Sequence, residues 1–185
     1  MMRIVSLNTI TTLFISLALI HCSSKPDTSP STSDENPLVV FLVRHGEKVD
    51  HSDDAQLSDA GIERAILLAK ILRSAEIEYV HSSDFARTRD TAAPTATEYD
   101  LDIEIYDHQN LPALVEKIRD MGGRHLVVGH STTTPAMVGL MGGQPGPTID
   151  DENEYDRLYI VTIGNDGNAN SILIRYGKAY FPQVN

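Results

Sequence analysis

The sequence predicts an α/β fold: a three-layer sandwich whose mainly parallel central sheet is covered by helices on both faces and ends in an antiparallel hairpin. Three observations support this prediction. Strand-like and helix-like patterns alternate from residue 37 onward, as in parallel β-α-β units. The first strand-like run is continuously apolar, which is typical of strands buried on both faces. The last two strand-like runs are separated by the turn-forming residues Gly164–Asn168.

The first strand is predicted at Leu38–Val43, a run of β-forming apolar residues. A helix follows, because Ser58 can cap it and apolar residues then recur at helical spacing. These residues are Ile62, Ala65, Ile66, Ala69 and Leu72. The same alternation continues to the end of the chain. Further strands are predicted at 77–80, 103–106, 126–128, 158–163 and 171–175, and further helices at 86–98, 111–121 and from 130 to about 141.

The chain divides into three parts by composition. Residues 1–21 resemble a secretory signal, because Leu13–Ile20 is an apolar run preceded by Arg3 and by no acidic residue. The alternative is a buried strand or first helix of the domain. Residues 22–36 are rich in Ser, Thr and Pro and predict a flexible tether that reaches about 20 Å. Residues 37–185 form the predicted domain.

Cys22 directly follows the apolar run and is the single cysteine of the chain. The segment Leu19–Cys22 resembles a bacterial lipobox, although His21 stands where a small residue is usual. We therefore expect lipidation at Cys22 and an exported, membrane-anchored protein that faces the periplasm or the cell exterior. A soluble exported protein, cleaved nearby, is the alternative. A single cysteine excludes an internal disulfide and a zinc site built from several thiolates.

The charge of the chain limits its partners. The chain has 26 acidic and 15 basic residues, which gives a formal net charge of -11. An acidic surface disfavours nucleic acid as a partner and disfavours electrostatic attachment to anionic lipid. Membrane contact is therefore expected only through the lipid anchor. The oligomeric state is left open by the sequence.

Three motifs follow predicted strands. Arg44–Glu47 reads Arg-His-Gly-Glu after the first strand, Ser82–Ala92 follows the second and contains Arg87, and Gly129–Ser131 reads Gly-His-Ser after the fourth. The carboxyl ends of parallel strands meet at one edge of a sheet, so two arginines and two histidines should meet there. Arginine grips two oxygens of a phosphoryl group at once, and a neutral imidazole is a nucleophile toward phosphorus. The motifs predict phosphoryl chemistry.

These motifs resemble those of the histidine phosphatase superfamily, also called phosphoglycerate-mutase-like, and the size of the domain is similar to that of its small single-domain branch. Ser82–Ala92 matches the pattern Ser-Ser-x-x-x-Arg-x-x-x-Thr-Ala, and Leu57–Gly61 resembles the start of the first helix in the family. The resemblance implies that His45 is transiently phosphorylated and that Arg44, Arg87 and His130 complete the phosphate pocket. It implies no cofactor and no metal.

In this family a carboxylate protonates the leaving oxygen, and its position varies between subgroups. Asp107, which follows the third predicted strand, is the favoured candidate for this role, and Glu47 and Glu104 are alternatives. Arg89 is expected to face solvent. The other histidines, His51, His81, His108 and His125, are expected to be surface or packing residues.

The sequence thus predicts a metal-independent phosphomonoesterase that acts on a small phosphorylated substrate or a phosphoprotein. A mutase of the same fold is disfavoured by the small size of the domain. A phosphate-recognising envelope lipoprotein without turnover is another possibility, and a metallohydrolase using His45, His130 and Asp53 is a third. Specificity should lie in loops 49–56 and 144–155, whose acidic residues disfavour polyanions.

Overall fold

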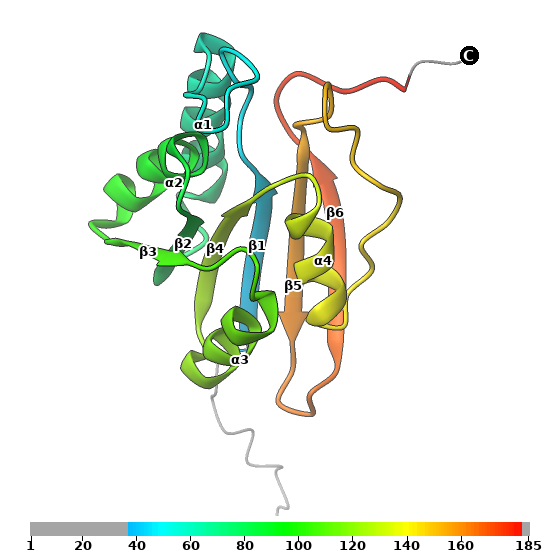
Figure 1. Cartoon of the computed structure of the whole chain (residues 1–185). Coiled ribbons are helices and arrows are strands. Elements are labelled where there is room, and N and C mark those ends of the chain that lie inside the picture. Colours follow the sequence, from blue (N-terminus) through cyan, green and yellow to red (C-terminus); the bar gives the residue numbers. More distant parts are fainter. Residues whose placement is uncertain (1–36, 183–185) are drawn as a thin grey trace, which may run out of the picture. The chain divides into compact units, whose positions relative to one another are not determined.

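The computed structural model describes residues 37–182, which form a six-stranded sheet and four helices (Figure 1). In chain order the elements are β1 (Leu38–Arg44), α1 (Asp59–Leu72), β2 (Tyr79–Ser83), α2 (Ala86–Tyr99), β3 (Ile103–Tyr106), α3 (Leu111–Met121), β4 (Arg124–Gly129), α4 (Thr133–Leu140), β5 (Arg157–Ile163) and β6 (Ala169–Arg175). Every predicted strand and helix of the domain is present. The predicted signal segment, Cys22 and the tether lie outside the described residues.

The sheet is mainly parallel, with an antiparallel hairpin at one side. Its strand order is β3-β2-β4-β1-β5-β6. Strand β1 pairs in parallel with β4, which is followed by β2 and β3 in the same direction. Strand β5 is antiparallel to β1, and β6 is antiparallel to β5. The predicted fold class is therefore confirmed, and the carboxyl ends of β2, β4 and β1 are neighbours.

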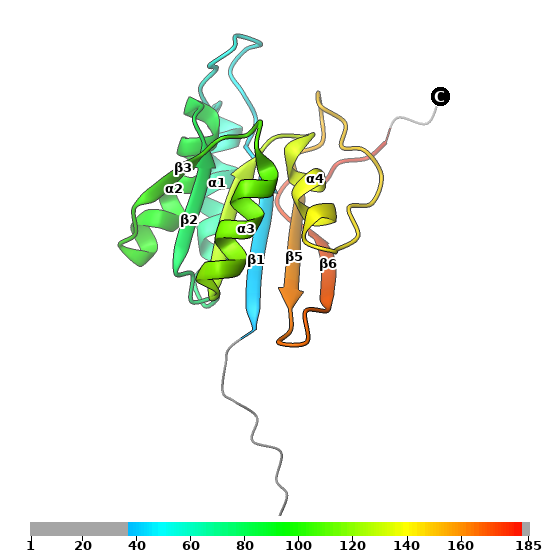
Figure 2. The same ribbon diagram turned by 60° about the horizontal axis from the view of Figure 1, so that its bottom comes forward.

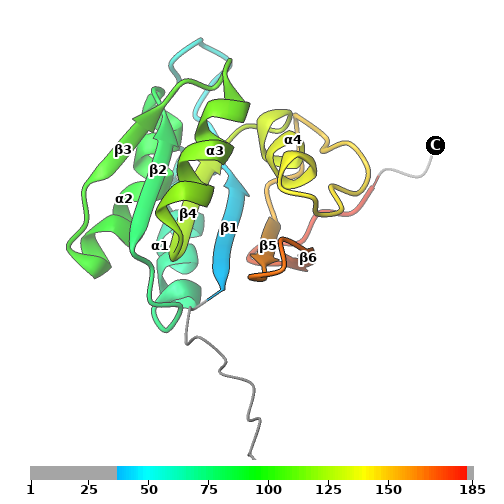
Figure 3. The same cartoon turned by 90° about the horizontal axis from the view of Figure 1, so that it is seen from below.

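Helices cover both faces of the sheet, with α3 and α4 on one face and α1 and α2 on the other (Figures 2 and 3). A hydrophobic core lies on each face of the sheet, and strand β1 contributes to both. Val40 and Leu42 lie in the core under α3 and α4, and Phe41 and Val43 lie in the core under α1 and α2. The face covered by α3 and α4 also contains Leu114, Val115, Ile118, Met137, Val138 and Met141. The face covered by α1 and α2 also contains Leu68, Leu72, Ala92 and Ala96.

Three of the five apolar residues that recur along α1 are buried, namely Ala65, Ala69 and Leu72. Ser58 caps this helix as expected, because its side chain accepts a hydrogen bond from the Gly61 N–H (3.3 Å). However, Ile62 and Ile66 are 47% and 43% exposed, and Arg64 is buried with 5% exposed. The helix turns Arg64 inward because its guanidinium pairs with a carboxylate near β1. The apolar spacing alone does not reveal this polar contact.

Within residues 37–182, none of the helices combines the length and apolar character needed to cross a bilayer.

Candidate active site

The structure brings the four predicted phosphate-pocket residues to one edge of the sheet. Arg44 ends β1 and His45 follows it, Arg87 lies in the first turn of α2, and His130 follows β4. The His45 N–H donates to the Gly129 carbonyl (2.9 Å), which joins the ends of β1 and β4. The rings of His45 and His130 meet edge to face, with 5.5 Å between their centroids. Residues 85 positions apart thus form one cluster, as the carboxyl-end rule predicts.

His45 is held as a neutral imidazole with one defined tautomer. Its Nδ1 lies 2.7 Å from the carbonyl oxygen of Gly46, which can only accept a hydrogen bond, so Nδ1 carries the proton. Burial of the ring, followed by the charges of Arg44, His130 and Arg87, lowers the pKa of His45 to about 3, against the opposing effect of the Gly46 hydrogen bond. The Nε2 lone pair is therefore available near neutral pH, as a nucleophile requires.

Arg44 is fixed by a loop far away in the sequence. Its Nη1 donates to the carbonyls of Asp150 and Glu154 (3.0 Å each), and its Nη2 donates to the Asp151 carbonyl and to Asp151 Oδ1 (3.0 Å for Oδ1). The ring of Tyr155 lies 4.1 Å from the guanidinium carbon. Arg44 is 1% exposed, so these contacts stabilise a buried cation with a defined orientation.

Arg87 is oriented by a different loop, the one between β1 and α1, and by Phe85. Its Nη1 donates to the Asp53 carbonyl (2.8 Å), and its guanidinium carbon lies 4.4 Å from the centre of the Phe85 ring. Among the described residues, four buried side-chain nitrogen or oxygen atoms have no hydrogen-bond partner, and two of them are Nε of Arg44 and Nε of Arg87. Unpartnered buried donors are rare, so these two N–H groups indicate the place of an anion.

His130 is the second neutral histidine. Its Nε2 lies 2.9 Å from Ser83 Oγ, and its backbone N–H donates to Thr133 Oγ1 (2.8 Å). Burial, then the charges of Arg87 and His108, lowers the pKa of His130 to about 4, although Asp151 opposes this. Ser83 in turn donates to Thr88 Oγ1 (3.1 Å), so β2 and α2 together orient the ring.

Phe85 and His108 border the site, a role that the sequence did not reveal. The Phe85 ring lies 5.0 Å from the His130 ring and 5.3 Å from the His108 ring, and His108 lies 5.8 Å from His130. His108 is adjacent to Asp107 but stands in no motif. Its position just after β3 was the one available signal, since β3 ends at the same edge of the sheet.

Gly46 and Gly61 allow two backbone segments to approach closely. A Cβ atom at Gly46 would lie 2.9 Å from the backbone of Gly61, and a Cβ at Gly61 would lie 2.3 Å from the Glu47 carbonyl oxygen. The two motif glycines therefore let the start of α1 pack directly against the loop after β1.

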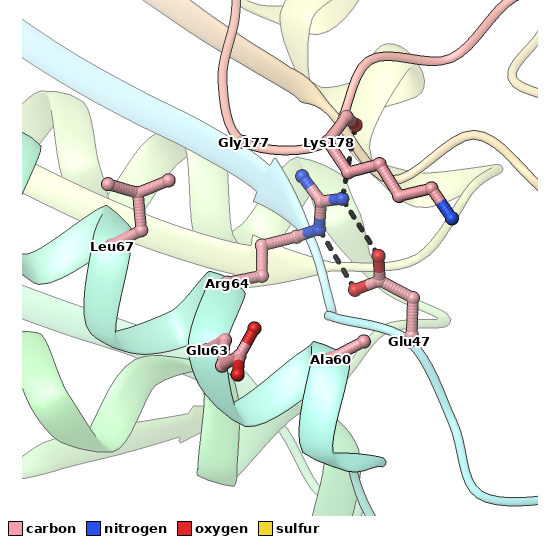
Figure 4. A pocket seen from close by; sticks show the side chains of 7 residues that line it. All are labelled: Glu47, Ala60, Glu63, Arg64, Leu67, Gly177 and Lys178. Carbon is pink, nitrogen blue, oxygen red and sulfur yellow. Dashed lines mark hydrogen bonds and ion pairs between the residues drawn. The ribbon is translucent and has the colours of Figure 1, made fainter.

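Glu47 is engaged away from the phosphate pocket. Its two carboxylate oxygens accept hydrogen bonds from Arg64 Nη2 (2.8 Å) and Arg64 Nε (2.9 Å), a bidentate pair that borders a hollow of about 170 Å³ (Figure 4). Arg64 also donates to the carbonyls of Tyr176 (2.8 Å) and Lys178 (3.3 Å). Glu47 thus anchors the C-terminal segment through Arg64.

The other two candidate acids make no direct contact with His45 or His130. Glu104 Oε2 lies 2.7 Å from Lys117 Nζ and 3.3 Å from His81 Nδ1, on the edge strand β3. Asp107 is exposed and accepts the Gln109 N–H (2.9 Å). Its position at the end of β3, next to His108, keeps it near the site, so its role as proton donor stays a prediction.

Two other expectations concern Arg89 and a bound metal ion. Arg89 pairs with Asp84 at the surface, as expected of a solvent-facing residue. In the part of the chain from 37 to 182, no three His, Cys, Asp or Glu side chains gather closely enough to hold a metal ion. Asp53, the third ligand of the metal alternative, contributes its carbonyl oxygen to Arg87.

The fold and these motifs are similar to those of histidine phosphatases. Residues 40–111 match the model of the histidine phosphatase superfamily (branch 1). The structure is similar to that of the protein histidine phosphatase SixA complexed with tungstate, with a TM-score of 0.59, 23% identity and coverage of 75% of this chain and 97% of that chain. The resemblance expected from the motifs is thereby confirmed.

Two further proteins are similar, one in its fold and one in its sequence. A mycobacterial glucosyl-3-phosphoglycerate phosphatase shares the fold with a TM-score of 0.60 and 12% identity, over 78% of this chain and all of that chain. A Yersinia pestis protein named "Probable phosphoglycerate mutase GpmB" is 39% identical over 62 residues. This match covers 30% of this chain and 29% of the length of that relative.

Proposed function

We propose that this protein is a phosphomonoesterase that works through a phosphohistidine intermediate on His45 and needs no metal. The observation that carries the proposal is the pair of buried, unpartnered Nε–H groups of Arg44 and Arg87 beside two neutral histidines. A dianionic phosphoryl group supplies the acceptors that these donors lack.

The geometry supports a two-step reaction. In the first step the lone pair on His45 Nε2 forms a bond to phosphorus while the bond from phosphorus to the leaving oxygen breaks, and that oxygen takes a proton from an acid. In the second step water attacks phosphorus, the P–N bond breaks, and the carboxylate left by the first step takes the proton from water, so inorganic phosphate leaves with His45 neutral and the acid protonated again. Arg44 and Arg87 balance the charge on the phosphoryl oxygens, and His130 can donate a hydrogen bond to them. Asp107 is the favoured acid.

The decisive experiment is the turnover of an aryl phosphate by wild type and by His45→Ala. We expect the variant to lose at least about three orders of magnitude in kcat, because the covalent nucleophile is removed. His51→Ala is the matched control, since His51 is exposed, and should keep wild-type activity. Mass spectrometry of a quenched reaction should detect one phosphoryl group on His45. Activity of His45→Ala within about tenfold of wild type would contradict the proposal.

Two other functions remain distinguishable. A phosphate-recognising lipoprotein would bind phosphate esters without turnover, and a mutase would return the phosphoryl group to its substrate instead of releasing inorganic phosphate. The phosphatases among the similar structures favour hydrolysis. A panel of small phosphate esters and a phosphoprotein, scored both for released phosphate and for isomerised ester, separates all three and identifies the substrate class.

We also propose export and lipidation at Cys22, on the sequence features of residues 1–36. The negative net charge adds a physical reason, because a chain of this charge has no electrostatic route to an anionic membrane. Lipid on Cys22 would instead attach the chain to the membrane through its acyl chains.

A further inference from the structure

One side chain of the loop between α4 and β5 contacts two residues of the proposed phosphate site. Asp151 Oδ1 lies 3.0 Å from Arg44 Nη2 and 2.5 Å from Ser131 Oγ, and the hydroxyl donates to it. The Asp151 side chain is nevertheless 65% exposed, so it can move without disturbing the core. One carboxylate oxygen thus receives an N–H and an O–H at once, as an oxygen of a bound phosphoryl group does.

The donors of Arg44 show why this contact matters. A guanidinium has five N–H groups. Three of those in Arg44 are directed to backbone carbonyls of the loop, one to Asp151 Oδ1, and the Nε–H has no partner. A phosphoryl group that takes the Nε–H together with an Nη2–H must displace an oxygen of Asp151. The side-chain oxygen is the mobile one.

The charge of Asp151 also acts on the whole cluster. It opposes the lowering of the pKa of Arg44, of Arg87 and of His130. The hydrogen bond from Ser131, followed by the charge of Arg44, holds the pKa of Asp151 itself below its usual range. Asp151 is therefore ionised near neutral pH, and it repels a second anion in the same position.

We propose that Asp151 is a specificity-determining residue that occupies one oxygen position of the phosphate pocket and that the substrate must displace. The proposal rests on the function proposed above and assigns that site an internal competitor. The Asp151 carboxylate competes with dianions and so lowers their affinity for the site. Because it belongs to the same chain, it loses no translational freedom when it occupies the position. Asp151 thus sets how readily free phosphate and other small anions bind.

The test compares vanadate and inorganic phosphate as inhibitors of aryl-phosphate turnover by wild type, Asp151→Asn and Glu152→Gln. The first variant keeps the size of the side chain and removes its charge. The second removes the same charge one residue away, from an exposed carboxylate that has no hydrogen bond to Arg44. We expect Asp151→Asn to bind vanadate tighter by on the order of fivefold, a typical value for removal of one partly exposed ionic competitor. Glu152→Gln should change binding by less than about twofold, since a screened charge at a distance has little effect.

Weaker or unchanged vanadate binding by both Asp151→Asn and Asp151→Ala would overturn the proposal, because it would mean that Asp151 orients Arg44 or has no role. The amide of Asp151→Asn can keep the contacts with Arg44 and Ser131, whereas Asp151→Ala removes them. Asp151→Ala should also bind vanadate more tightly than wild type. If neither wild type nor the variants bind vanadate or turn over substrate, the phosphate pocket itself is refuted, and the proposed function fails with it. Wild-type turnover with unchanged variants refutes only the role of Asp151.

Discussion

The ion pair between Glu47 and Arg64 allows a structural role of Glu47 to be separated from a catalytic one. Glu47→Gln removes the charge but keeps the size of the side chain. Arg64 is 5% exposed and forms two hydrogen bonds to the Glu47 carboxylate, so the substitution leaves a buried guanidinium without its counter-charge. The remaining partners of Arg64 are the carbonyls of Tyr176 and Lys178.

The expected destabilisation follows from this geometry. Breaking a fully buried ion pair costs about 3–5 kcal/mol. The Glu47 side chain is 22% exposed and Arg64 keeps its two carbonyl partners, so the cost should be about 2–3 kcal/mol. For a domain of this size, that lowers Tm by roughly 5–10 °C. Catalysis should change little, because both carboxylate oxygens point to Arg64 and not to the histidines.

The assay combines urea unfolding with aryl-phosphate turnover at a temperature where the variant is folded. Glu63→Gln is the matched control, since Glu63 borders the same hollow and is exposed (Figure 4). It should change neither stability nor turnover. If Glu47→Gln kept full stability and lost about 100-fold or more in kcat, Glu47 would be the proton donor and the structural assignment would be wrong.

Three further predictions concern the metal, the pH and the anchor. EDTA should leave turnover unchanged and vanadate should inhibit it; activity lost in chelator and restored by zinc or magnesium would favour the metal alternative. The protein should lose stability as the pH falls from 6.5 toward 4. The pKa of His45 is lowered to about 3 and those of His81 and His130 to about 4, so the unfolded chain takes up protons first. Each of these histidines should lower the free energy of unfolding by about 1–2 kcal/mol between pH 7 and pH 5. A urea midpoint that is equal at both pH values would contradict this prediction. Full-length protein should partition into detergent and Cys22→Ser should not carry lipid; an intact mass of mature wild type that shows an unmodified chain starting elsewhere would exclude the anchor.

Most of the fold could be predicted because it depends on local patterns. The apolar run at Leu38–Val43 has one compatible state, a strand buried on both faces, and Ser58 and the turn residues at Gly164–Asn168 set boundaries through their own backbone and capping chemistry. The carboxyl-end rule then placed Arg44, His45, Arg87 and His130 at one edge. These features need no knowledge of distant contacts.

The remaining features depend on contacts between residues far apart in the chain. Arg64 is buried where it pairs with Glu47, whereas Ile62 and Ile66, which share the apolar periodicity of α1, are exposed. Asp151 reaches Arg44 across 107 residues, through a loop that the sequence predicted to carry specificity without showing which of its acids meets Arg44. The sequence determines which local structures form and which side chains follow the strands. The tertiary structure decides which distant loop returns to them, because loop closure depends on packing that leaves no local pattern.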